Sequence, residues 1–161
     1  MQRKVNGLLI FLVFIVFSCD SKRVFDTYNS LPEFWHQDSV QTFKFDSKDS
    51  LSTYNLFLNI RNKEDYPFNN LFLVTEITYP HGKTISDTLE YLMAYPDGSL
   101  MGTGFSTVKE NKLIYKEGFH FEENGIYTIQ VNQAMRKYDH TDGVKALKGI
   151  TDVGFRIETK N

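Results

Sequence analysis

Apolar and polar residues alternate with a period of two along much of this chain. In LSTYNLFLNIRN (residues 51–62), Tyr54, Leu56, Leu58 and Ile60 fall on one face, and mostly polar residues take the other. Successive side chains of a β-strand point to opposite faces of a sheet, so this pattern predicts a half-buried strand. Further strands are predicted in NLFLVTEITYP (70–80), TISDTLEYLMA (84–94), GIYTIQV (125–131) and DVGFRIE (152–158).

The register of the last predicted strand should be firmly set. Val153, Phe155 and Ile157 point one way, so a shift by one residue would bury Arg156 and Glu158 instead. Such a shift would place charged side chains in the core, which is strongly unfavourable.

Turn signals separate the predicted strands. They are the polar segment KEDYPFN (63–69), Pro80-His81-Gly82 and Pro96-Asp97-Gly98. Several short strands joined by such turns predict an all-β fold, an antiparallel β-sandwich that is Ig-like or jelly-roll-like. Helix should be minor, and NQAMRKYDH (132–140) is compatible with either a short helical turn or an extension of the preceding strand.

The N-terminus has the features of a processing signal. Arg3 and Lys4 precede the apolar run LLIFLVFIVF (8–17), which is too short to span a bilayer and has the length of a signal-peptide core. Ser18 and then Cys19, the single cysteine of 161 residues, follow directly. The segment Val16-Phe17-Ser18-Cys19 matches a loose lipoprotein box, in which the thiol forms a thioether to diacylglycerol. We therefore predict Cys19 as a lipidation site; a secreted protein with a stray cysteine and an uncleaved anchor helix are the alternatives.

These signals divide the chain into three parts: a lipoprotein signal peptide (1–18), a lipidated tether with at most one weak helical turn (19–33) and a β-sandwich domain (34–161). Two or three acyl chains hold a protein stably at a membrane, whereas one binds marginally.

After removal of the signal, the chain has 16 basic and 20 acidic residues, a formal charge of −4, so nothing indicates a nucleic-acid partner. With one cysteine the fold must rely on its core, for which 14 Phe and 9 Tyr are available.

Candidate catalytic and metal-binding residues are sparse. The four histidines show no metal-ligand spacing, and no Gly-x-Ser-x-Gly motif occurs, so we predict no metal site, no cofactor and no enzyme. Asp87, Glu90 and Asp97 could supply a glycosidase pair only by chance proximity. DHTDG (139–143) lacks the order of a calcium loop and is interpreted as a solvated turn. The histidines are His36, His81, His120 and His140.

Aromatic residues allow a second functional class, a glycan-binding module. Exposed aromatic rings can stack on sugars, but a sandwich core also uses aromatic residues, and we expect most of these to be core. The candidates are Trp35, Tyr54, Tyr66, Tyr79, Tyr91 and Tyr95.

The chain resembles the gliding-motility lipoprotein GldH family of Bacteroidota. The resemblance rests on CDSKRVFDTYNSLP after the signal, YNLFLNIRNKEDYPFNNLFL (54–73), SDTLEYLMAYPDG (86–98), GIYTIQVNQAMR (125–136) and GITDVGFRIE (149–158). It runs from the cysteine to the end of the chain. Leu100 departs from the family, in which a tryptophan is expected near this position, and this argues against a fixed aromatic contact in GSLMGTG (98–104).

The resemblance implies a membrane lipoprotein that acts with other gliding lipoproteins and the associated type IX secretion machinery. It implies no enzymatic activity and no cofactor, and Cys19 is the one position whose role it transfers. Surface-exposed lipoproteins of this phylum resemble one another in an acidic run after the cysteine; here Ser21, Lys22 and Arg23 follow Asp20. We therefore expect the domain to face the periplasm from the outer membrane. The alternative function remains an envelope glycan-binding sandwich.

Overall fold

The computed structural model describes residues 21–104, 107–138 and 140–160. The predicted signal peptide and Cys19 lie outside these residues. Within the described part of the chain, no helix has the length and hydropathy needed to cross a membrane. The strands are β1 (Arg23–Ser30), β2 (Phe34–His36), β3 (Gln41–Ser47), β4 (Thr53–Lys63), β5 (Asn70–Thr78), β6 (Thr84–Leu92), β7 (Val108–His120), β8 (Gly125–Gln133), β9 (Ala146–Lys148) and β10 (Ile150–Thr159).

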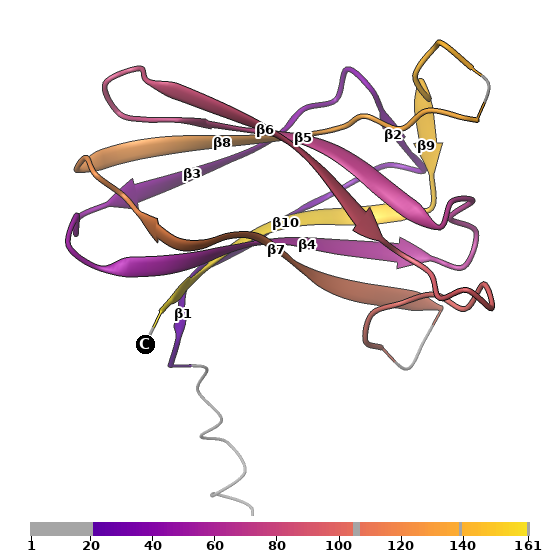
Figure 1. The fold of residues 1–161 in the computed structure, drawn as a ribbon, viewed down its shortest axis with the longest axis horizontal. Coiled ribbons are helices and arrows are strands. Elements are labelled where there is room, and N and C mark those ends of the chain that lie inside the picture. Colours follow the sequence, from indigo (N-terminus) through magenta and orange to yellow (C-terminus); the bar gives the residue numbers. More distant parts are fainter. Residues whose placement is uncertain (1–20, 105–106, 139, 161) are drawn as a thin grey trace, which may run out of the picture.

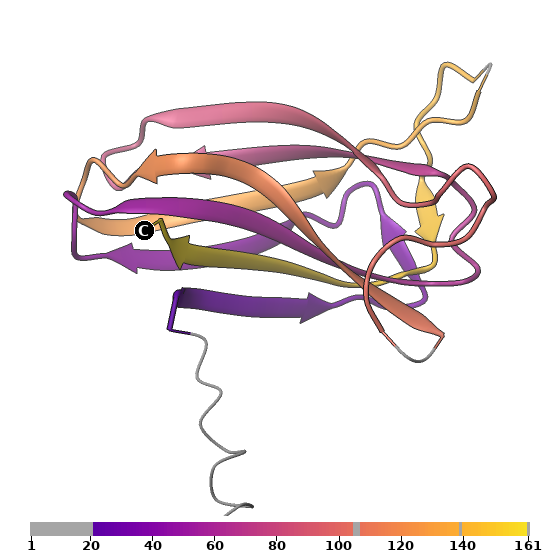
Figure 2. The same cartoon turned by 60° about the horizontal axis from the view of Figure 1, so that its bottom comes forward.

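Two four-stranded antiparallel sheets pack face to face (Figures 1 and 2). The first, called sheet I, has the order β1-β10-β4-β7, and the second, sheet II, has the order β3-β8-β5-β6. A short pair of strands, β2 and β9, lies at one end of the sandwich (Figure 1). The prediction of an antiparallel β-sandwich is confirmed.

The strand order distinguishes between the two predicted sandwich types. Apart from the β5–β6 hairpin, every connection between the eight sandwich strands passes from one sheet to the other. An immunoglobulin sandwich divides its strands differently, whereas eight strands in two such four-stranded sheets form a jelly roll. The fold is therefore a jelly roll.

The alternation predicted for β4, β5, β8 and β10 is confirmed. Leu56, Leu58 and Ile60 of β4 are fully buried, and they belong to one core cluster with Leu71 and Leu73 of β5. The core also contains a cluster of aromatic rings around Phe121, whose neighbours are Phe45, Tyr54, Phe119 and Tyr127 at centroid distances of 4.8–5.4 Å. Because no disulfide is possible, this packing carries the stability of the fold.

Residues 23–30, which the sequence analysis placed in the tether, form strand β1, and this corrects the prediction. β1 pairs with β10 along its length, from Arg23 opposite Glu158 to Ser30 opposite Asp152. Phe25 packs against Phe45 at 5.6 Å between ring centroids. The segment has little alternation of its own, and its partner strand lies about 130 residues away, so the local sequence carries no sign of the pairing.

Strand β7 is long but was not predicted. Its pairing with β4 contains two register irregularities, and Gly118 within it adopts a φ of 64°. Each irregularity interrupts the period of two, because an extra residue moves the following side chains to the other face. Of the alternatives for residues 132–140, the strand extends to Gln133, and no helix forms in the described part of this segment.

Gly149 links β9 to β10, and its substitution tests whether the backbone there needs a positive φ and a close approach to Tyr66. We predict that Gly149→Ala lowers the free energy of unfolding by about 2–3 kcal/mol, since a side chain at positive φ costs about 1–2 kcal/mol and a clash adds to it. The φ of Gly149 is 87°, and an added Cβ would lie 2.5 Å from the Tyr66 Cα. Urea unfolding measures the difference.

Gly82→Ala is the matched control for Gly149→Ala. Gly82 has a similar φ of 92°, but a Cβ there meets no atom within 4 Å. It should therefore show the conformational cost without the clash, about 1 kcal/mol. Equal losses in the two variants would contradict the close approach of Gly149 to Tyr66.

Candidate functional site

One end of the sandwich receives the chain from the predicted lipid attachment site; we call it the anchor end. The backbone N–H of Thr159, the last residue of β10, donates to the carbonyl of Lys22 at 2.9 Å. The chain is therefore held by the fold from Lys22 onward. The start of β1 lies beside the C-terminal end of β10, and the β3–β4 turn lies at the same end of the sandwich (Figures 1 and 2).

The opposite end, called the loop end, holds longer connections and several surface grooves between described residues. β1 runs from the anchor end to the loop end, where β2, β9 and the segments 93–104, 134–138 and 140–145 are gathered (Figure 1). The grooves are lined by the residues that end β1 and β4, those that begin β7 and β10, and these connecting segments. A partner that approaches from the side away from the anchor meets this end first.

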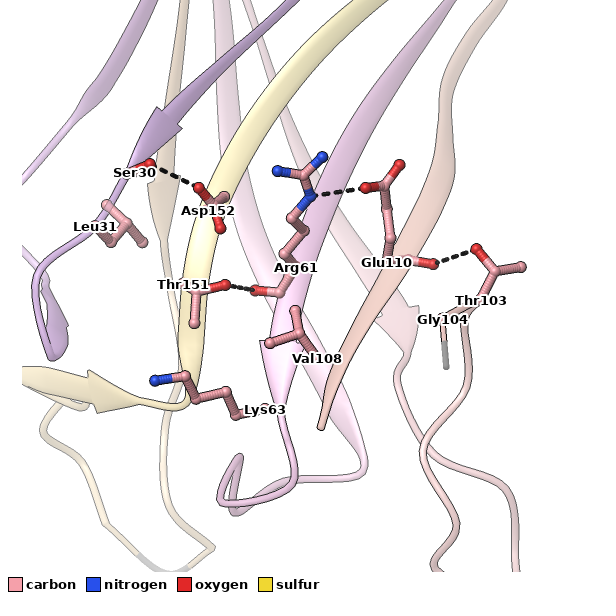
Figure 3. A pocket seen from close by; sticks show the side chains of 10 residues that line it. All are labelled: Ser30, Leu31, Arg61, Lys63, Thr103, Gly104, Val108, Glu110, Thr151 and Asp152. Atoms are coloured by element: carbon pink, nitrogen blue, oxygen red, sulfur yellow. Dashed lines mark hydrogen bonds and ion pairs between the residues drawn. The ribbon is translucent and has the colours of Figure 1, made fainter. Parts of the chain in front are cut away.

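The largest groove, about 810 Å³ in volume and open to solvent, lies beside the outer face of sheet I (Figure 3). We call it the rung groove because one row of paired residues crosses it. Its lining is Ser30, Leu31, Arg61, Lys63, Thr103, Gly104, Val108, Glu110, Thr151 and Asp152.

The row that crosses the groove comes from four neighbouring strands. The register places Ser30 opposite Asp152, Asp152 opposite Arg61, and Arg61 opposite Glu110. The Ser30 hydroxyl donates to Asp152 Oδ1 at 2.7 Å, and Arg61 Nε donates to Glu110 Oε2 at 2.7 Å (Figure 3). Hydrogen bonds to charged groups are stronger than neutral ones, so this row is held in a defined arrangement.

Tyr28 lies beside this row and connects it to the rest of sheet I. Its hydroxyl donates to Glu110 Oε1 at 3.1 Å and accepts from Asn59 Nδ2 at 2.9 Å. The Arg61 guanidinium lies 4.2 Å from the centre of its ring. Burial, followed by the nearby Glu110 and Asp26 carboxylates, raises the pKa of Tyr28 to about 12. Tyr28 is therefore a neutral donor at physiological pH.

A second ordered network continues across the outer face of sheet I. Arg156 donates to Asp26 Oδ2 at 3.0 Å and to Glu158 Oε1 at 2.6 Å, and Lys112 Nζ donates to the same Glu158 oxygen at 2.6 Å. Burial raises the pKa of Glu158, but the hydrogen bonds from Lys112 and Arg156 outweigh burial and lower the pKa overall. This face is thus a fixed array of charges, unlike a surface of mobile side chains.

The residues of the rung groove are suited to binding a polar ligand. Glu110 is paired with Arg61 and Asp152 accepts from Ser30, while the Lys63 side chain has no ion pair among the described residues. Ser30 donates to the Asp152 carboxylate, which is a weak base, and no histidine is among the residues that line the groove. The groove offers hydroxyl groups, paired charges and a lysine to a polar ligand.

The residues considered for catalysis and metal binding lie apart and have ordinary partners. His81 bonds Glu123 at 2.8 Å, and no group of three or more His, Cys, Asp or Glu that could hold a metal occurs among the residues described. Asp87 is held by Tyr115 and Lys116 at 2.9 and 2.8 Å; burial raises its pKa, but these two partners outweigh burial and lower it overall. Glu90 accepts from Asn70, and Asp97 accepts from Ser99. Residue 139 of DHTDG lies outside the described residues.

The six aromatic candidates for sugar stacking do not form an exposed row. Trp35, Tyr54, Tyr66 and Tyr79 are buried in the core, and Tyr91 is half-buried with its hydroxyl on the Ile114 carbonyl. Tyr95 is exposed. The expectation that most of these rings are core residues is confirmed, which removes the main support for glycan binding.

Sequence reasoning missed the residues that form the rung groove. Arg61 and Asp152 were placed correctly on outward faces of their strands, but their neighbours were not known. Tyr28 and Ser30 were assigned to the tether, and Glu110 lies on the unpredicted β7. No local signal in residues 23–30 identifies β10 as the partner of β1.

Comparison with known proteins identifies close relatives. The GldH lipoprotein family matches residues 23–157. "Gliding motility lipoprotein GldH" of Flavobacterium johnsoniae is 53% identical over 161 residues, with 100% of both chains covered. "Gliding motility lipoprotein GldH homolog" of Christiangramia forsetii is 54% identical over 151 residues, covering 94% of this chain and 93% of the relative.

Solved structures give only a distant likeness. The VP2 subviral particle of infectious bursal disease virus aligns with a TM-score of 0.37 and 10% identity, over 87% of this chain and 34% of that chain. At this level the likeness carries no argument.

Proposed function

Because the chain belongs to the GldH lipoprotein family, we propose that it is an accessory component of the gliding motility machinery and of the associated type IX secretion system. The observation that carries this proposal is the full-length match to the Flavobacterium johnsoniae lipoprotein, which is 53% identical over 161 residues. The match covers 100% of both chains.

We propose that the protein acts by binding other proteins of this machinery. The open grooves at the loop end and the ordered charges on sheet I support this mode of action. A lipid anchor confines such a domain to two dimensions and raises its effective concentration near membrane partners. The preferred partners in this proposal are other gliding lipoproteins.

Cys19 is the proposed attachment point, and the outer membrane with the domain in the periplasm is the proposed location. Cys19 is the one thiol in the chain, and a lipoprotein needs a thiol for its thioether. The absence of an acidic run after Cys19 supports a periplasmic orientation. Protease treatment of intact cells tests it, since loss of the protein without lysis would place the domain outside the cell.

The test of the function is a deletion in the source organism, complemented with wild type, Cys19→Ala or Ser21→Ala. Colony spreading, secretion of type IX cargo and levels of the other gliding lipoproteins are measured. We expect loss of spreading or secretion, rescue by wild type and by the control Ser21→Ala, and no rescue by Cys19→Ala, because that variant cannot form the thioether.

Normal spreading together with normal secretion in the deletion strain would refute a role in this machinery. Full rescue by Cys19→Ala, with the protein still in the membrane fraction, would refute Cys19 as the anchor.

A further inference from the structure

We propose that the anchor end of the sandwich is a membrane-contacting surface, in which Leu51 enters the lipid headgroup layer and the basic residues around it meet the phosphates. The ligand is the surface of a phospholipid bilayer. This inference rests on the proposed lipidation of Cys19, and it sets the orientation of the domain, with the loop end pointing away from the membrane.

The first step of the argument is the length of the connection. Lys22 is already held by a backbone hydrogen bond from Thr159. Cys19 precedes it by three residues, and consecutive Cα atoms are 3.8 Å apart, so the two Cα atoms are at most about 11 Å apart. The headgroup layer on each side of a bilayer is about 5–8 Å thick. An anchored Cys19 therefore brings the anchor end to the headgroups.

The second step is that the anchor end carries an exposed apolar side chain. Leu51, at the tip of the β3–β4 turn, is 89% exposed, the highest value among the large aliphatic side chains described as exposed. The turn holds it in place, because Asp49 Oδ1 accepts from the backbone N–H groups of Leu51 and Ser52 at 2.8 and 3.3 Å. A single exposed leucine is ordinary on a protein surface. Here it lies at the end that the tether brings to a membrane.

The third step is that the turn carrying Leu51 and the start of β1 lie at the same end of sheet I, with the end of β10 between them. Lys160 N–H donates to the carbonyl of Thr53 at 2.9 Å, and Thr159 N–H donates to Lys22. The strand β4, which begins two residues after Leu51, is thus bonded through Thr53 to Lys160, the residue that follows Thr159. Two backbone hydrogen bonds therefore join the end of β10 to Lys22 on one side and to the start of β4 on the other.

The fourth step is charge. Lys22, Arg23, Lys48 and Lys160 are exposed around this end, and cationic side chains near a bilayer are attracted to its anionic lipids. Acidic residues are also present at this end. Asp49 is engaged with its own turn, and Asp46 lies 3.9 Å from Lys48. Glu122 and Glu123, on the adjacent β7–β8 turn, contact Lys83 at 3.4 Å and His81 at 2.8 Å, respectively. Val24, the unpaired residue of a bulge at the start of β1, adds a partly exposed apolar side chain.

The test uses the chain from Cys19 onward, which contains every strand, with tryptophan placed at three exposed positions. Cys19 is coupled to a maleimide-bearing phosphatidylethanolamine in vesicles of phosphatidylethanolamine and phosphatidylglycerol that contain a nitroxide-labelled lipid. The variants are Leu51→Trp, Ile114→Trp on the outer face of sheet I and Tyr138→Trp at the loop end. The native Trp35 is fully buried and gives a constant background.

We expect Leu51→Trp to lose most of its added emission to the nitroxide and to shift to shorter wavelength, while Tyr138→Trp and Ile114→Trp keep theirs. Uncoupled protein with the same vesicles provides the baseline. Quenching of Ile114→Trp in place of Leu51→Trp would mean that the outer face of sheet I lies against the membrane. Equal quenching of Leu51→Trp and Tyr138→Trp would mean that the domain rotates freely about its anchor. Either result overturns the proposal. Because the coupling is chemical, the result does not depend on whether cells lipidate Cys19, so failure here is distinguishable from failure of the proposed function.

Discussion

Phe121→Ala is expected to lower the free energy of unfolding by about 3–5 kcal/mol, a large part of the total of about 5–15 kcal/mol for a domain of this size. Phe121 is fully buried, and its ring contacts four other aromatic rings. Removing it takes away buried apolar area and leaves a cavity that the surrounding rings cannot fill. The midpoint of urea unfolding, followed by circular dichroism, measures the loss.

Tyr138→Ala is the control for Phe121→Ala. Tyr138 is 93% exposed, so its removal should change stability by no more than about 0.5 kcal/mol. Phe121→Leu, which keeps much of the volume, should fall between these two variants. A loss below about 1 kcal/mol for Phe121→Ala would contradict the central position of this ring in the core.

Alkaline unfolding is the second large effect that we expect. Burial raises the pKa of Tyr91 to about 12, and burial together with nearby carboxylates does the same for Tyr28. Burial raises the pKa of Tyr66 and Tyr115 further, and a hydrogen bond to Asp87 adds to it for Tyr115. A tyrosine in the unfolded chain titrates near pH 10.

The sign of the effect follows from these directions. A folded-state pKa above the unfolded value means that the unfolded chain loses protons first as the pH rises. The stability contributed by these tyrosines is complete below about pH 10 and is lost between about pH 10 and 12. We expect cooperative unfolding in this range, with tyrosinate absorbance and circular dichroism changing together.

Tyr66→Phe separates this linkage from general alkaline damage. At neutral pH it should cost about 1 kcal/mol, because the Tyr66 hydroxyl donates to the Asn70 carbonyl at 2.6 Å. Its stability should then fall less steeply above pH 10, since one titrating group is gone. Tyr138→Phe is the exposed control and should change neither quantity. Titration of all nine tyrosines near pH 10 with the fold intact would refute the prediction.

In the orientation proposed for the domain, its two ends have different roles. The anchor end would contact lipid, and the loop end would hold the grooves that face possible partners. The rung groove is lined by residues from four strands of sheet I, whose positions are fixed by backbone pairing. Partner binding there would therefore require little rearrangement of the strands, although the side-chain ion pairs could exchange.

The sequence by itself determined the fold class, the faces of the regular strands and the single candidate for lipidation. Alternation in residues such as Leu56, Leu58 and Ile60 is a local property, because each side chain's face follows from the pleat of its own strand. The turns at Gly82 and Gly98 are local for the same reason. The resemblance to the GldH family was also carried by segments of contiguous sequence.

Only the tertiary structure decided which outward side chains are neighbours. Alternation places Arg61 and Asp152 on exposed faces, but the groove exists because β10 lies between β1 and β4, and β7 pairs with the other edge of β4. These pairings join residues 49 to about 130 positions apart, such as Arg61 with Glu110, and they depend on the packing of the whole core. The strand β1 and the position of the Leu51 turn at the same end of the sandwich as the start of β1 follow from the same long-range contacts, which no local pattern encodes.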